Sequence, residues 1–176
     1  MKKKFYQNLL IFLTIFLIFQ VNLKADIPYF VDFKYILNQS NAGKQAQDYL
    51  KKKLTNGIKK LKEQEKSVQQ EEQKIIKQKK VLSAEEYKKQ VSQLRNKVSS
   101  LQKERNNLLE TVAKQRAKAK SELIKNLNPI INKYMQEKNI KMVIDKKGIL
   151  LADQSFDLTK TITDLLNKKL KTIKLD

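Results

Sequence analysis

Apolar residues recur at every seventh position along the middle of the chain. They are Leu54, Leu61, Val68, Ile75 and Leu82. Such a heptad repeat places one stripe of a helix against another helix. The companion positions three residues further on are polar or glycine, so only half of a normal seam is apolar: Gly57, Gln64, Glu71 and Gln78. The pattern predicts a long helix that starts near Ala42 and packs loosely.

A second apolar stripe follows, with steps that alternate between four and three residues. Its members are Tyr87, Val91, Leu94, Val98, Leu101, Leu108 and Val112. Between the stripes, Ser83 and Glu86 have the spacing of a capping box at a new helix start. We expect two limbs, each of about 40 residues and roughly 60 Å, that form an antiparallel helical hairpin. One continuous helix is the alternative, because no glycine or proline enforces a turn at residues 80–83.

The beginning of the chain after residue 26 has a β pattern. Residues 27–33 form a short, mostly apolar run that predicts a strand. Asp32 and Ser40 follow at positions that suit N-caps, the first for a short helix around residues 35–37 and the second for the long helix. The sequence therefore predicts a strand at the foot of the first limb.

The other end of the chain also has strand and helix signals. Pro129 predicts that the returning limb ends or kinks there. Residues 140–144 and 149–152 are two apolar runs that predict a β-hairpin, with Gly148 in the left-handed conformation at its turn. Asp157 is placed to cap a last amphipathic helix that extends to Ile173.

These elements predict an α+β fold that is mostly α. A small β body would be formed by residues 26–41 and 126–176, and residues 42–125 would form a coiled-coil-like arm. Three strands make a marginal sheet with exposed edges, so we expect the bodies of several subunits to pair. The positions expected to be buried in this oligomerisation body are Phe30, Val31, Val143, Ile144, Leu150, Leu151 and Leu165.

The first residues have the order of a secretory signal peptide. Lysines at positions 2–4 precede an uninterrupted apolar block, Leu9 to Phe19, and a small residue, Ala25, follows. An uncleaved membrane anchor is the alternative, but it needs about 18 apolar residues, which is more than this block has. We therefore expect residues 1–25 to be a signal peptide and the protein to be exported.

The composition restricts the chemistry that the protein can perform. The chain has no cysteine and no histidine, and hence neither a disulfide framework nor the commonest general base and metal ligand. We predict no enzyme activity and no catalytic, cofactor or metal site. Lysine and arginine outnumber aspartate and glutamate by 38 to 18, and residues 42–125 hold 23 basic and 10 acidic residues. Such an excess attracts anionic partners through many weak, salt-sensitive contacts.

Export and the absence of an aromatic stacking platform argue against a physiological nucleic-acid partner. Anionic lipid or lipopolysaccharide surfaces and unfolded polypeptides are the partners that suit the charge.

Particular residues at both ends resemble the Skp/OmpH family of periplasmic chaperones. The matching start comprises Val31-Asp32, Ile36-Leu37, Ser40, Gly43-Lys44, Ala46 and Leu50, and the matching close is residues 140–170. The resemblance implies a periplasmic homotrimer whose strands form one β body and whose three helical hairpins surround a cavity. It also implies an ATP-independent holdase for unfolded outer-membrane proteins, with no catalytic residues. A coiled-coil spacer or adaptor of the envelope without chaperone activity is the alternative, and a surface-binding protein that acts through its lysines is a third.

Overall fold

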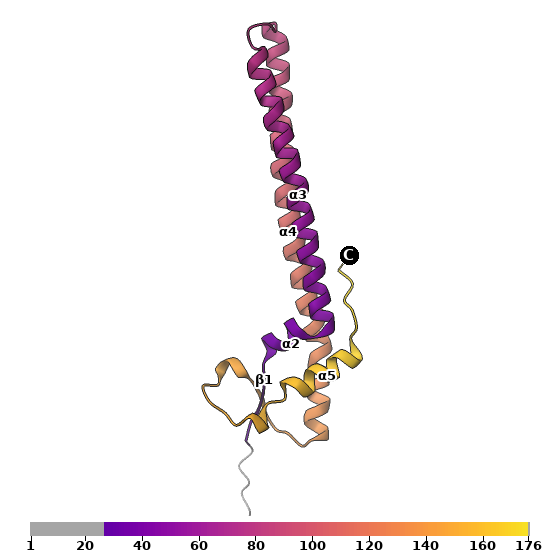
Figure 1. The fold of residues 1–176 in the computed structure, drawn as a ribbon. Coiled ribbons are helices and arrows are strands. Elements are labelled where there is room, and N and C mark those ends of the chain that lie inside the picture. Colours follow the sequence, from indigo (N-terminus) through magenta and orange to yellow (C-terminus); the bar gives the residue numbers. More distant parts are fainter. Residues whose placement is uncertain (1–26, 176) are drawn as a thin grey trace, which may run out of the picture.

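The computed structural model describes residues 27–175, so the predicted signal peptide lies outside the described residues. Two long helices lie side by side, and a small body sits at one end of the pair (Figure 1). In chain order the helices and strands are β1 (Tyr29–Val31), α2 (Phe33–Gln39), α3 (Asn41–Gln78), α4 (Ala84–Glu137), β2 (Val143–Asp145) and α5 (Thr159–Lys169). Two 3-10 turns, Lys146–Gly148 and Gln154–Phe156, lie between β2 and α5. The mostly helical α+β class is confirmed.

The predicted N-caps are confirmed at the starts of three helices. Asp32 Oδ1 accepts a hydrogen bond from Tyr35 N at 2.7 Å and begins α2. Ser40 Oγ accepts from Gly43 N at 3.2 Å and begins α3. Ser83 does the same for α4. Each cap satisfies a backbone donor that has no partner within its helix, so these helix starts are determined locally.

The break between the long helices falls where the capping box predicts it. α3 ends at Gln78 and α4 begins at Ala84, so the alternative of one continuous helix is wrong. Ion pairs join Glu71 to Lys97 and Glu65 to Arg105 across the two helices. A residue earlier in α3 therefore pairs with a residue later in α4.

The returning limb does not end at Pro129. The proline lies inside α4, which continues to Glu137. Leu127, Ile130 and Ile131 on either side of it are buried in the body core. Proline costs an interior helix its hydrogen bond, but burial of these apolar neighbours offsets that cost and holds the helix together.

The body has a smaller sheet than the three strands expected. β1 pairs with β2 in parallel, with Phe30 opposite Ile144. The predicted β-hairpin is wrong, because residues 149–152 form no strand and no glycine among the described residues has a positive φ. The other edge of β1 is used instead by residues 157–158: Leu158 N donates to Phe30 O at 2.9 Å. Residues 149–152 are thus left without a strand partner within one chain.

The main hydrophobic core lies where the two ends of the chain meet the base of α4. Its fully buried side chains are Val31, Ile36, Ala42, Leu127, Ile162 and Leu166. Phe30 is also buried, whereas Val143 and Leu165 pack against the core while partly exposed. This core holds residues from both termini of the described chain against the long helices.

Burial along the arm follows the predicted seams, with one departure. Leu61, Ile75 and Val112 are buried. Seven of the other seam residues are half-buried: Leu54, Val68, Leu82, Val91, Leu94, Leu101 and Leu108. Val98 is 51% exposed and does not lie in the seam of this single chain. At this level of the arm, the neighbouring Lys97 reaches across to α3 and pairs with Glu71.

Candidate functional site

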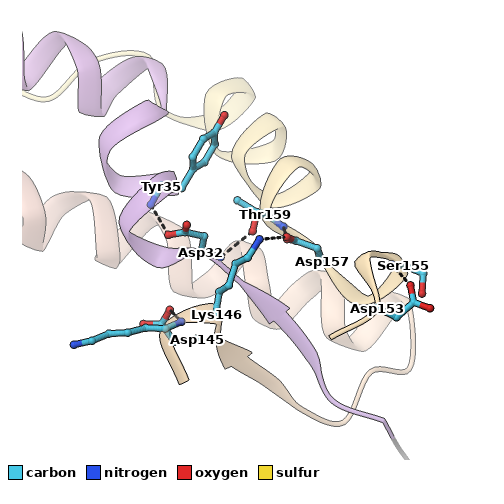
Figure 2. A network of polar contacts seen from close by, with 9 residues as sticks. Asp32, Tyr35, Asp145, Lys146, Asp153, Ser155, Asp157 and Thr159 are labelled. Atoms are coloured by element: carbon cyan, nitrogen blue, oxygen red, sulfur yellow. Dashed lines mark hydrogen bonds and ion pairs between the residues drawn. The ribbon is translucent and has the colours of Figure 1, made fainter. Parts of the chain in front are cut away.

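A polar network fastens the two ends of the chain together within the body (Figure 2). Asp157 accepts from Thr159 N at 2.8 Å and pairs with Lys146 Nζ at 2.9 Å. Asp32 N donates to Thr159 Oγ1 at 2.8 Å, which ties the end of β1 to the start of α5. Lys146 Nζ also lies 5.5 Å from the centre of the Phe30 ring. Every member has a partner in the fold, so the network is structural.

The carboxyl group of Asp157 is held in its charged form. Burial opposes ionisation, but hydrogen bonds from Thr159 and the ammonium of Lys146 outweigh it and lower the pKa of Asp157 below its ordinary value. The N-cap residue of α5 is Leu158, which makes no side-chain cap hydrogen bond, so the predicted cap at Asp157 is wrong by one residue. Asp157 lies one position earlier and accepts a hydrogen bond from Thr159 N. The negative charge of Asp157 therefore stabilises its contacts with Lys146 and with the start of α5.

An uncovered apolar surface lies beside this network. Leu150 is 96% exposed and Leu151 is 91% exposed, and Met142 and Ile144 are also exposed. Ile144, Leu150 and Leu151 are therefore not buried within one chain, contrary to the sequence-based expectation, and their predicted role in an oligomer stays a prediction. Two adjacent leucines that are almost fully exposed indicate a surface that another molecule covers.

A groove of about 960 Å³ lies at the base of the arm, between α2, α3 and α4. Its apolar lining includes Phe33, Leu37, Leu50, Leu54, Leu123 and Ile124, together with Ala46 and Ala119. Four basic side chains border it, Lys34, Lys51, Arg116 and Lys120, together with Asp48 and Asp145. The groove is therefore apolar inside and cationic around the edge, a combination suited to an amphipathic anionic ligand.

The arm is a long cationic surface. Ion pairs in the described part of the arm involve three acidic residues, namely Glu65, Glu71 and Glu110. With 23 basic and 10 acidic residues between 42 and 125, most of the positive charge is left facing solvent. The arm can attract an anionic chain along its whole length.

The described residues contain no group of histidine, cysteine, aspartate and glutamate side chains that could hold a metal ion. Within the same residues, none of the helices is both apolar enough and long enough to span a bilayer.

Sequence reasoning missed two features at the base of the arm. The groove depends on α2 folding back against α3 and α4, which no local pattern reports. The end of the chain was expected to be helical to Ile173, but α5 ends at Lys169. Leu175 is instead buried against the arm, and its alternation with Ile173 across Lys174 is the one signal that favours an extended segment.

The fold and its surfaces define a class of protein in which a small body, made from both ends of the chain, carries a long pair of helices. The helix pair has a cationic surface and an apolar groove at its base. The model of the family described as "Outer membrane protein (OmpH-like)" matches residues 29–166, and the chain belongs to this family.

Among solved structures, the chain is similar to a crystal structure from Caulobacter crescentus of a protein described as a proposed outer membrane chaperone (OmpH-like). The TM-score is 0.78 and the identity 20%, and the match covers 90% of this chain and 95% of that one. At this identity the similarity shows the fold. No curated protein matches the chain.

Proposed function

We propose that this protein is a periplasmic, ATP-independent holdase chaperone that binds unfolded outer-membrane proteins between the arms of a homotrimer. Membership of the OmpH-like family and the fold shared with the Caulobacter crescentus protein support this proposal. The observation that carries it is the cationic arm attached to a body with an uncovered apolar surface. Export by the signal peptide at residues 1–25 would bring the protein to the compartment of its clients.

The state of the body in one chain supports the proposed trimer. Its sheet has two strands, and a sheet of that size is marginal in water. Covering Leu150 and Leu151 would contribute about 1.5 to 3 kcal/mol for each side chain. In the proposed assembly, residues 26–41 and 126–176 form the shared body, and residues 42–125 of each subunit form an antiparallel hairpin arm beside a common cavity.

The arms hold clients by many weak contacts. Polar residues occupy half of the seam positions on α3, so the helices gain little from packing and their far ends can separate to suit clients of different size. Positive charge raises the local concentration of acidic unfolded chains and keeps their strands from pairing with each other. Anionic lipid or lipopolysaccharide surfaces would be attracted by the same charge.

Aggregation of a refolding outer-membrane barrel tests the holdase. The barrel is diluted from urea with and without the purified protein at a near-equal concentration of trimer, and light scattering is followed. We expect scattering to fall strongly, and more so at low salt because the attraction is electrostatic. Undiminished aggregation would contradict the proposal. Crosslinking that recovers a stable folded partner and no unfolded chain would favour an envelope spacer instead.

Assembly is tested separately with a charge at the apolar loop. Leu151→Asp should dissociate the trimer, because loss of about 3 kcal/mol weakens association by about two orders of magnitude. Val81→Asp is the matched control, since Val81 is 80% exposed but lies at the far end of the arm. Sedimentation at micromolar concentration reads out the mass. A Leu151→Asp variant that remains trimeric would remove the loop from the interface.

A further inference from the structure

The residues after α5 return to the arm as an extended segment. This tail, residues 170–175, leaves the body and runs up beside the base of the helix pair (Figure 1). Ile173 packs against both apolar clusters of the molecule. Leu175 is buried, and it packs with Ala46, Leu50, Val112 and Ala119 of α3 and α4. The residue before Ile173, Thr172, and the residue between Ile173 and Leu175, Lys174, are exposed. The tail thus docks as a strand does, with alternate side chains facing the arm.

The side-chain amide of Gln115, beneath the tail, has a hydrogen-bond partner for only one of its two polar atoms among the described residues. Gln115 Nε2 donates to the backbone oxygen of Leu175. Gln115 Oε1 is buried and has no hydrogen-bond partner among the described residues. A side-chain amide has both a donor and an acceptor, and an extended chain offers both a carbonyl and an N–H. A bound strand whose N–H reaches Gln115 Oε1 would satisfy the atom that the tail leaves unpaired.

Two lysines of the tail do not suit the basic surface on which it lies. Residues 44–54 and 110–120, which contain the docking positions, hold eight basic and two acidic side chains. The segment after α5 adds two lysines, Lys171 and Lys174, and one acidic residue, Asp176. Neither lysine forms an ion pair with any described residue. Like charges at short range destabilise a contact. The apolar fit is therefore good while the two lysines are unfavourably placed, so a segment with the same alternation and neutral or acidic residues in place of these lysines would bind better than the tail does.

We propose that the tail is a tethered ligand, and that it covers a binding site at the base of the arm for extended segments with alternating apolar residues. The occupant is a segment of an unfolded β-barrel, whose strands alternate apolar and polar residues, with acidic or neutral residues between the apolar ones. This proposal rests on the proposed function, because it names where a client segment binds. The family match ends at residue 166, before the tail begins, so the matched family features do not include it.

While the tail covers the site, no other segment can bind there. The apparent affinity of the site is therefore its intrinsic affinity multiplied by the fraction of time for which the tail leaves it open. If the site is open for one tenth of the time, removal of the tail raises the apparent affinity about tenfold. Clients would then displace the tail in two steps, by electrostatic attraction to the arm and by docking of alternate apolar side chains.

A labelled peptide with the sequence of the tail provides a test that needs no outer-membrane protein. Its binding is measured by fluorescence anisotropy to the full protein and to a variant that ends at Leu170. We expect the shortened variant to bind the peptide about tenfold more tightly. A second peptide, with glutamate at the positions of Lys171 and Lys174, should bind more tightly still at low salt and lose that advantage at high salt.

Point variants in the intact chain provide the matched control. Leu175→Asp should release the tail and raise peptide binding as truncation does. Thr172→Asp adds the same charge at an exposed position and, at high salt where the attraction to the basic arm is screened, should change binding little. If the variant that ends at Leu170 has a weaker helical circular dichroism signal than the full protein, truncation has disturbed the fold, and the comparison then rests on the Leu175→Asp variant. Equal binding to the full protein and to both tail-released variants, or binding to none of them, would overturn the proposal. So would equal binding of a peptide with aspartate in place of Ile173 and Leu175.

The two proposals fail in distinguishable ways. A protein that suppresses aggregation but shows no tail effect keeps its holdase function and loses this site. A protein that binds the peptide on release of the tail but does not suppress aggregation has the site without the holdase function.

Discussion

Gly43 is a position where one added methyl group should damage the joint between body and arm. It lies in the first turn of α3, and its N–H donates to the Ser40 cap at 3.2 Å. A Cβ built on Gly43 would lie 2.9 Å from Ser40 Oγ and 3.0 Å from the carbonyl carbon of Leu37, and closer still to the Leu37 oxygen. Since Leu37 contributes backbone atoms, a side-chain rotation cannot relieve the overlap.

The expected cost follows from three opposing contributions. Overpacking costs about 1 to 3 kcal/mol when the backbone must move. Weakening of the Ser40 cap costs about 1 kcal/mol more. Alanine returns up to about 1 kcal/mol because it favours the helical conformation more than glycine does. Gly43→Ala should therefore lower the free energy of unfolding by about 1 to 3 kcal/mol.

Gly57 provides the matched control because it undergoes the same chemical change inside the same helix. A Cβ there would lie 2.7 Å from Leu108 Cδ1 and 3.2 Å from its Cγ. These atoms belong to the end of a flexible, half-buried side chain that can adopt another rotamer. Helix propensity then offsets most of the cost, and Gly57→Ala should change the free energy of unfolding by less than about 1 kcal/mol.

Urea denaturation followed by far-ultraviolet circular dichroism measures both variants at one protein concentration. Fixed concentration matters because the stability of an oligomer depends on it. A Gly43→Ala variant as stable as the unmodified protein would refute the reasoning, and so would equal losses in both variants. The first result would mean that the bend between α2 and α3 adjusts freely, contrary to the close contact at Leu37 and Ser40. The second would mean that the Leu108 side chain gives way no more easily than the backbone at Leu37.

Two further changes test the arm and the body. Leu61→Ala should lower the free energy of unfolding by about 2 to 4 kcal/mol because it empties a buried seam position. Leu109→Ala, at a position that is 51% exposed, should lower it little in the same urea titration. Equal losses of stability in the two variants would contradict the assigned seam. Because the pKa of Asp157 is lowered in the folded state, its contribution to stability is present above its unfolded pKa of about 3.9 and is lost as the pH falls through the folded pKa. Asp157→Asn should therefore be about 1 kcal/mol less stable near neutral pH and lose less stability on acidification, and unfolding curves with the same pH dependence in both proteins would disprove this role.

Much of the helical architecture could be predicted because its signals are local. Asp32, Ser40 and Ser83 each bond to a backbone N–H three residues along, so the sequence within one turn is enough to place a helix start. The heptad repeat similarly identifies Leu61 and Ile75 as buried, because it depends only on helix geometry. Short-range hydrogen bonds and a regular period are the features that a sequence reports directly.

The errors occur where contacts between distant parts of the chain decide the outcome. The expected hairpin partner of residues 140–144 does not form at residues 149–152, and residues 157–158 pair instead with the free edge of β1, far away in the sequence. α4 runs through Pro129 because buried neighbours offset a local penalty. The groove and the docked tail also depend on how α2 and the end of the chain lie against the long helices.

The sequence by itself determined the two helices, their caps, the break between them, the excess of positive charge and the absence of histidine and cysteine chemistry. The tertiary structure alone decided which segment pairs with β1, which leucines are left exposed on the body, and what covers the base of the arm. The physical reason is range: caps and heptads act within one or two helical turns, whereas strand pairing and burial depend on competition between segments more than a hundred residues apart, such as Asp32 and Thr159.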